Sequence, residues 1–231
     1  METRSYDQFC PVAMAAEILC SRWTMVLLRE LVSGSTRFNE LRRGVPRMSP
    51  ALLAKRLREL EDAGIVEHRA SDNGGTAEYV LTDAGRDLRP VVMAVGLWGQ
   101  RWVQAQTSLR NLDPGLLMWD MRRNLNPVPL PSKRCVIQFL YPDVAVAKRA
   151  WWLIVDHDSL DLCSVDPGLD VDLYVVADLR AMTAIWMGLS SVATEVEAGT
   201  LRLTGDERLA NRMQSWLGLS PFAGEKKRVL S

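Results

Sequence analysis

The segment 36–68 constrains the fold of this chain most, because it carries both the start and the stop signals of a helix. Ser49 is a favourable N-cap, and Pro50 follows at the first helical position, where its missing N–H costs no hydrogen bond. Gly64 is placed to end the helix. We therefore predict a helix over residues 50–63.

This helix has two contrasting faces. Leucines recur at i, i+4 and i+7 on one face, which must contact a core; they are Leu53, Leu57 and Leu60. The opposite face is small near the helix start and basic further along, and consists of Ala51, Ala54, Lys55 and Arg58. Short side chains let a helix approach base edges in the major groove, and Lys or Arg can then reach guanine or phosphate.

A short helix is predicted just before it. Phe38 and Leu41 are spaced to pack inward, and the Gly/Pro segment 44–47 joins this helix to the next. Helix, turn and helix in this order form a helix-turn-helix motif. The alternative is an ordinary helical hairpin whose basic face is merely solvated.

A β-hairpin and a long helix are predicted to follow. The β-prone runs 65–69 and 78–82 flank an Asn-Gly-Gly turn at 71–75, which would form the wing of a winged helix. Thr82 can cap a last helix that runs to about Leu109 and is kinked or restarted at Pro90. One stripe of that helix carries Val91, Val95, Trp98 and Trp102.

Residues 6–105, taken in order, resemble the HxlR-type regulators within the MarR-related winged-helix transcription factors. The matching residues are Cys10-Pro11-Val12, Arg22-Trp23-Thr24, Arg37-Phe38-Asn39-Glu40-Leu41, Met48-Ser49, Leu53, Leu57-Arg58-Glu59-Leu60-Glu61, Gly64-Ile65-Val66, Glu78-Tyr79, Leu81-Thr82, Gly85-Arg86 and Leu88. The resemblance implies a homodimer that binds a pseudo-palindromic operator in double-stranded DNA.

The expected DNA contacts fall into two groups. The second helix would enter the major groove with Ser49, Ala51, Ala54, Lys55 and Arg58. Phosphates would be contacted by Arg37, Arg42, Arg43, Arg47 and Arg69. The net charge of the chain is zero, but residues 37–69 hold eight basic and five acidic side chains, so positive charge is concentrated in this segment.

Two other features of residues 1–110 have alternative explanations. Trp98 and Trp102 are assigned to a dimer interface, because terminal helices make the dimer contact in the resembled family; a junction with the next domain, or a plain core role, remains open. Cys10 precedes a helix, whose dipole can lower the pKa of a thiol, and a cysteine here senses oxidants in some HxlR-type proteins. Simple packing is the alternative for Cys10.

Length and composition limit the other function classes. The 231 residues predict two domains, 1–110 and 111–231. Four cysteines without a CxxC pair and only two histidines argue against a metal site, and we expect no cofactor. His157 has no partnered nucleophile, so we expect no enzyme activity. Without an apolar run of 18 residues or a signal peptide, the chain is expected to be cytoplasmic with no membrane partner.

Residues 111–231 are predicted to form an α+β domain behind a connector, 111–132, that is rich in proline and contains a short helix starting near Asp113. Strands are predicted at 135–141, 151–155, 160–164 and 171–176, and helices with apolar stripes follow them. The helices should lie on one face of the sheet. The basic tail 225–228 is expected to be a solvated end.

This second half resembles the sterol-carrier-protein-2 fold, in the segment 199–206 and in the strand and helix of 171–188. The resemblance implies an apolar tunnel between sheet and helices. Met182, Trp186, Met213 and Trp216 are candidates to line it, or else they fill a core.

The whole chain is thus expected to be α+β, a winged helix-turn-helix domain followed by a sterol-carrier-2-like domain. Its expected function is DNA-binding transcriptional regulation modulated by a small apolar ligand. The alternatives are a lipid or small-molecule carrier that is dimerised by its winged helix, and a redox-sensing repressor acting through Cys10.

Overall fold

The computed structural model of the chain describes residues 5–70, 77–104, 109–156 and 159–229. The chain divides into two compact units, Met1–Gly96 (unit 1) and Leu97–Ser231 (unit 2). The division lies inside a helix, about 14 residues before the boundary expected from composition. Gln100, in the last turn of that helix, donates a hydrogen bond to the Met187 carbonyl (3.1 Å), so this turn belongs with unit 2.

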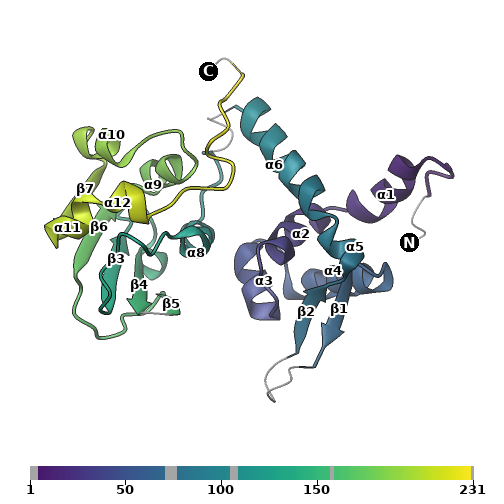
Figure 1. The fold of residues 1–231 in the computed structure, drawn as a ribbon, viewed down its shortest axis with the longest axis horizontal. Helices are drawn as coiled ribbons and strands as arrows, with labels where there is room; N and C mark the ends of the chain where they lie inside the picture. The colour runs from purple at the N-terminus through teal and green to yellow at the C-terminus, as the bar shows by residue number, and fades with distance from the viewer. Residues whose placement is uncertain (1–4, 71–76, 105–108, 157–158, 230–231) are drawn as a thin grey trace. The chain divides into compact units, whose positions relative to one another are not determined.

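Unit 1 combines short helices with a two-stranded hairpin (Figure 1). Its elements in chain order are α1 (Pro11–Leu19), α2 (Thr24–Val32), α3 (Phe38–Gly44), α4 (Pro50–Asp62), β1 (Val66–Arg69), β2 (Glu78–Leu81), α5 (Asp83–Arg86) and the first turns of α6 (Arg89–Trp102). The expected helix-turn-helix is formed by α3 and α4.

The helix α4 has the expected ends and the expected buried face. The Ser49 hydroxyl accepts a hydrogen bond from the Leu52 N–H (3.3 Å). Gly64 follows the helix with φ +68°, a backbone conformation that glycine adopts without strain. Leu53, Leu57 and Leu60 are at most 1% exposed and lie in the core of unit 1.

A buried polar contact joins α2 to the end of α3. The Glu30 carboxylate is fully buried and pairs with Arg29 (2.6 Å), which also donates to the Gly44 carbonyl (2.9 Å). A Cβ on Gly44 would lie 1.9 Å from Glu30 Cδ, so the glycine leaves room for the carboxylate. By contrast, α1 has no buried residue, and it is α2 that supports the helix-turn-helix.

The hairpin is antiparallel, with Val66 opposite Leu81 and Arg69 opposite Glu78. An isolated bridge between Arg37 and Glu78 adds a short third segment to it. Residues 71–76, which contain the expected turn, lie outside the described residues. Next along the chain, α5 and α6 are separate helices, because the chain restarts at Arg89 with Pro90 in the first turn.

Unit 2 contains a five-stranded sheet and helices. After the last turn of α6, its elements are α8 (Pro114–Asn124), β3 (Cys135–Leu140), η1 (Val146–Lys148), β4 (Ala150–Asp156), β5 (Ser159–Cys163), β6 (Leu173–Ala177), α9 (Leu179–Trp186), α10 (Val192–Glu197), β7 (Leu201–Gly205), α11 (Glu207–Asn211) and α12 (Met213–Trp216). The four expected strands are present, whereas β7 was not predicted.

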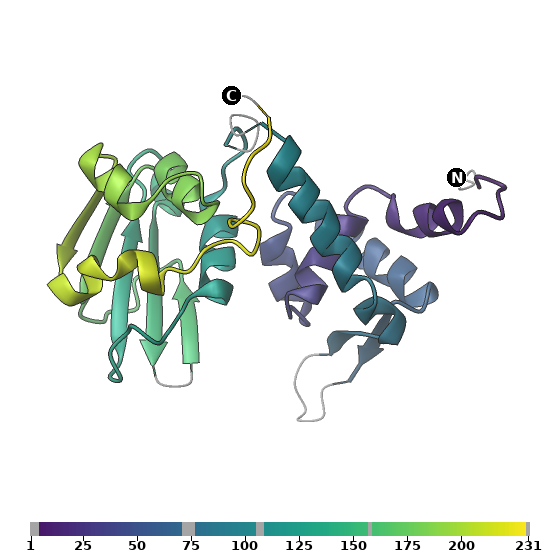
Figure 2. The same ribbon diagram turned by 45° about the horizontal axis from the view of Figure 1, so that its top comes forward.

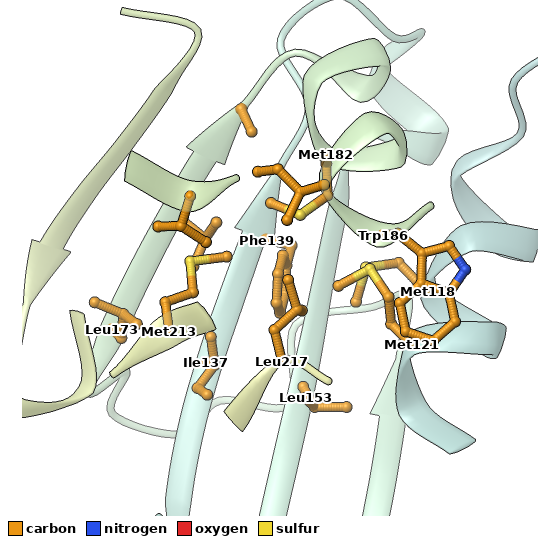
Figure 3. Packing of buried hydrophobic residues seen from close by; sticks show 14 of the residues in the cluster. Met118, Met121, Ile137, Phe139, Leu153, Leu173, Met182, Trp186, Met213 and Leu217 are labelled. Atoms are coloured by element: carbon orange, nitrogen blue, oxygen red, sulfur yellow. The ribbon is translucent and has the colours of Figure 1, made fainter. Parts of the chain in front are cut away.

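The strand order is β5-β4-β3-β6-β7, with β3 and β6 parallel and every other pair antiparallel. Helices gather on one face of this sheet (Figure 2). Side chains of β3 and β4 on that face, among them Ile137, Phe139 and Leu153, pack with residues of α8, α9 and α12 (Figure 3). This face forms the core of unit 2, as the α+β prediction required.

Among the described residues, no single helix is both long and apolar enough to cross a membrane. The pair α1 and α2 meets the length and composition criteria only when both are taken together across a bend of 85°.

The tight packing of α5 on the start of the hairpin can be tested at Gly85. A Cβ there would lie 2.2 Å from the Ile65 carbonyl oxygen, so backbone must move in Gly85→Ala. We expect this change to destabilise the protein by about 1–3 kcal/mol. Gly99 in α6 has no heavy atom within 4 Å of an added Cβ, so Gly99→Ala should be neutral or stabilising by up to about 1 kcal/mol. Equal urea midpoints for the two variants would contradict the described packing.

Candidate nucleic-acid interface

The face of α4 opposite the leucines is open to solvent. Ala51, Lys55 and Arg58 are exposed and Ala54 is half-buried. This face therefore carries short side chains at the start of the helix and basic side chains along its middle. A surface of this shape can approach base edges with its backbone and reach phosphate or guanine with its cations.

Ion pairs engage some of the predicted DNA-contacting cations. Lys55 Nζ lies 3.8 Å from Glu59 Oε1 with 62% of its side chain exposed, Arg37 pairs with Glu78 (3.2 Å), and Arg69 pairs with Glu67 (2.6 Å). Exposed pairs of this kind contribute at most about 1 kcal/mol, so phosphate can compete for these cations.

The remaining predicted cations surround α3 and α4. Arg42 and Arg43 are exposed in the last turn of α3, and Arg47 is exposed in the connection to α4. Within the part of the chain that the structure describes, no carboxylate lies within 4 Å of Arg42, Arg47 or Arg58. Ser49 is exposed, but its hydroxyl is engaged as the helix cap.

Arg56 helps to position α4, a role that the sequence analysis did not predict. Its Nε donates to the Arg22 carbonyl (3.1 Å), and it also pairs with Glu59 on its own helix. Only 16% of its side chain is exposed. Its partial burial could have been predicted from its position three residues after Leu53, which places it at the edge of the buried face of α4. Arg56 therefore holds α4 against the start of α2.

The hairpin is attached to the core beside α4. Tyr79 of β2 stacks on His68 of β1, with ring centroids 4.6 Å apart. Burial raises the pKa of Tyr79, and the nearby Glu61 carboxylate adds to the effect while Arg58 opposes it. The Tyr79 N–H donates to the Thr36 carbonyl (2.7 Å), which ties the hairpin to the segment before α3.

Apolar side chains are exposed on α6 and on and around α1. Trp98 is 61% and Trp102 is 45% exposed, so neither fills a core in the isolated chain. Val91 and Val95 of α6 are exposed as well. The exposed apolar residues at α1 are Phe9, Val12, Met14 and Ile18, a group that the sequence analysis did not single out.

Cys10 is exposed at the N-cap position of α1. The backbone N–H groups of Ala13 and Val12, at the start of α1, lower the pKa of its thiol. Cys135 is the opposite case, because burial, with a contribution from the Asp172 charge, raises its pKa to about 12. Cys10 therefore has the more reactive environment of the two.

The four candidate tunnel residues lie in the packed core of unit 2. Met182, Met213 and Trp216 are fully buried and Trp186 is 6% exposed. Figure 3 shows Met182, Trp186 and Met213 among the packed side chains of this core. The Trp216 indole N–H donates to the Leu209 carbonyl (2.8 Å). Their side chains thus fill the space between helices and sheet, which was the alternative given for them, and the lining of an open tunnel is not seen there.

A cavity of about 870 Å³ that is partly open to solvent lies elsewhere in unit 2, and none of these four residues lines it. Its apolar wall is formed by Val192, Val196 and Leu203, and polar groups of Arg202, Asn211 and Gln214 lie around it. Sequence patterns could not locate it, because its walls come from β6, α10, β7 and the α11–α12 segment.

Across the described ranges, no group of three or more His, Cys, Asp or Glu side chains is arranged to hold a metal ion.

The chain matches the family model described as HxlR-like helix-turn-helix over residues 18–107. This segment contains α2 to α6 and therefore the whole interface described above.

Two related proteins are named as uncharacterized HTH-type transcriptional regulators. YdeP of Bacillus subtilis (strain 168) is 36% identical over 101 residues, which cover 42% of this chain and 79% of YdeP. Rv3095 of Mycobacterium tuberculosis (strain ATCC 25618 / H37Rv) is 37% identical over 139 residues, which cover 52% of this chain and 86% of Rv3095. Unit 1 holds 96 of the 231 residues, so the second match extends into unit 2.

Among solved structures, the chain is similar to the reduced form of the transcriptional regulator YodB from B. subtilis. The two are 32% identical, with a TM-score of 0.36, and the match covers 40% of this chain and 93% of that one.

Proposed function

The chain belongs to the HxlR-like helix-turn-helix family of transcriptional regulators, and from this premise we propose that α4 enters the major groove of an operator as part of a homodimer. Lys55 and Arg58 would reach base edges or phosphate. Arg37, Arg42, Arg43, Arg47 and Arg69 would contact the phosphates on either side. The proposal assigns no enzymatic reaction to the chain, which would act in the cytoplasm on DNA.

One observation carries this proposal. The leucines of α4 are buried in the core of unit 1, and this burial leaves Lys55 and Arg58 exposed on the outward face. A helix in the major groove presents such a face to DNA, whereas a structural hairpin needs no cluster of exposed cations there.

The test removes the two cations together. Lys55→Ala/Arg58→Ala should weaken binding to an operator fragment about 10–100-fold and make the logarithmic salt dependence less steep by up to about four units, since each protomer of the dimer loses two cations. The melting temperature should stay unchanged, since the ion pair that is lost among the described residues, Lys55–Glu59, is exposed. Fluorescence anisotropy with a duplex selected by the native protein from a random library would measure the affinity.

The matched control is Lys148→Ala/Lys226→Ala, which removes two exposed cations of unit 2. An equal loss in the control, or native affinity in the α4 variant, would contradict the DNA contact. The second result would instead favour the alternative of a carrier protein whose winged helix serves only dimerisation.

The exposed apolar residues of α1 and α6 support the homodimer. Val91, Val95, Trp98 and Trp102 lie on one side of α6, and burying apolar side chains against a second copy is favourable. A dimer places two copies of α4 on one duplex, as a pseudo-palindromic operator requires.

We further propose that unit 2, as a sterol-carrier-2-like domain, binds a small apolar ligand that modulates DNA affinity. The cavity beside β7 supports this, because about 870 Å³ is within the usual range for small-molecule sites. Its aliphatic wall suits an apolar body, and Arg202 and Asn211 suit one polar end. Coupling between ligand and DNA of about 1–3 kcal/mol would be typical.

The ligand proposal is tested with decanoate and 1-anilinonaphthalene-8-sulfonate as probes. Either probe should raise the melting temperature of the native protein and change its operator affinity. Val196→Trp, which places a large side chain on the cavity wall, should abolish both effects. Val146→Trp, at an exposed position outside the cavity, should retain them. If neither probe alters melting or operator affinity, and denaturing extraction of the purified protein releases no apolar molecule, the ligand proposal fails.

The lowered pKa of Cys10 supports a second candidate function, a redox-sensing repressor. Mild peroxide should then lower operator affinity in the native protein and leave Cys10→Ser unaffected. Because the thiolate is the reacting form and its pKa lies below the ordinary value, the oxidation rate should rise with pH to a midpoint below that of a free cysteine. Buried Cys135 should stay unmodified, as an internal control. Equal sensitivity of both proteins would exclude this role.

A further inference from the structure

Residues 225–229 do not form the solvated end that their charge suggested. Along this segment Glu225, Lys227 and Val229 are half-buried, while Lys226 and Arg228 are exposed. This alternation is typical of an extended segment with one side packed against the protein. The partner is the last turn of α6 and the residue after it, within unit 2.

Three polar contacts join this segment to α6. Arg101 donates through Nε to the Glu225 carboxylate, and the Arg228 N–H donates to the Arg101 carbonyl (2.9 Å). Lys227 Nζ donates to the Val103 carbonyl (2.7 Å). The hydrogen bond from Arg101 is also the main reason that the pKa of Glu225 is lowered.

These contacts satisfy groups that a helix end leaves without partners. The last carbonyls of an α-helix have no intrahelical donor, and the final turn frays unless they are bound. Here the Arg228 N–H binds the Arg101 carbonyl, and the Lys227 ammonium binds the carbonyl of Val103, the first residue after the helix. The negative end of the helix dipole favours a cation at this position.

The segment is itself anchored in unit 2. The Ser220 N–H donates to the Trp186 carbonyl at the end of α9 (2.9 Å). Gly188, with φ +70°, lies so close to Ala223 that an added Cβ would be 2.7 Å from the Ala223 carbonyl oxygen. Residues 225–228 are therefore held by the core of unit 2 on one side and hold α6 on the other.

We propose that residues 225–228 form a clamp that fixes the last turn of α6 and thereby sets the affinity of the homodimer. Trp98 and Trp102 lie in the last two turns of α6 and are exposed. When the turn is fixed, both indoles are presented in one orientation, and a second copy can bury them without first ordering the helix end. This inference rests on the proposed dimer through α6.

The test compares two adjacent lysines in the full-length chain. Lys227→Met removes the ammonium that binds Val103, whereas Lys226→Met removes an exposed ammonium of the same segment. Lys227→Met should speed amide exchange in residues 97–104 and raise the dimer dissociation constant, each by about tenfold. Lys226→Met should behave as the native protein. Hydrogen exchange with mass spectrometry and sedimentation equilibrium would measure the two quantities.

A charge exchange provides an independent second measurement. Glu225→Arg places two cations together and should weaken the dimer, whereas Arg101→Glu/Glu225→Arg should restore native association and exchange. Rescue by the charge exchange would show that the loss comes from the contact between positions 101 and 225 and not from the arginine at position 225 alone.

The outcomes separate the clamp from the proposed function. If the native protein sediments as a monomer, the dimer proposal fails and the clamp proposal with it. If the native protein is a dimer and Lys227→Met dimerises with native affinity, the clamp alone is overturned. Faster exchange together with weaker association, restored by the charge exchange, supports the clamp.

Discussion

Burial of the α4 leucines is the interaction on which the rest of unit 1 depends. Leu53, Leu57 and Leu60 are essentially inaccessible, and burying each such side chain is worth about 1.5–3 kcal/mol. The Lys55–Glu59 pair on the opposite face is exposed and worth at most about 1 kcal/mol. The apolar face therefore decides how α4 is rotated, and the outward position of its cations follows from that rotation.

Residues around α4 fix its position through hydrogen bonds to backbone groups and through a buried carboxylate. Arg56 binds the Arg22 carbonyl, the Glu30 carboxylate fills the space beside Gly44, and Tyr79 ties the hairpin to Thr36. None of these groups is expected to contact DNA. They hold the helix and the hairpin in fixed positions, so that binding DNA need not first order the surface that contacts it. The helix α6 begins in unit 1 and ends in unit 2, where the clamp binds its last turn.

Capping residues and hydrophobic spacing predicted where helices and strands lie more reliably than they predicted which other segments pack against them. The capping residues and leucine spacing gave α4 within one residue, and the β-prone runs gave the hairpin and four strands of the sheet. The strand β7 was missed because Leu201–Gly205 follows helices and has a short alternating pattern. The charged segment 225–228 was misjudged because its binding partner, the end of α6, lies more than 120 residues earlier in the sequence.

The sequence by itself determined where α4 begins and ends, which of its faces is buried and which residue types point outward, since these depend on spacing and capping within one segment. It did not determine the end of the last helix, which was expected near Leu109 but lies at Trp102. Only the tertiary structure decided that Trp98 and Trp102 are exposed, that Met182, Trp186, Met213 and Trp216 fill a core, and that the cavity lies beside β7. An apolar stripe looks the same in sequence whether it faces a core, a cavity or solvent, because the difference lies in what other segments place against it.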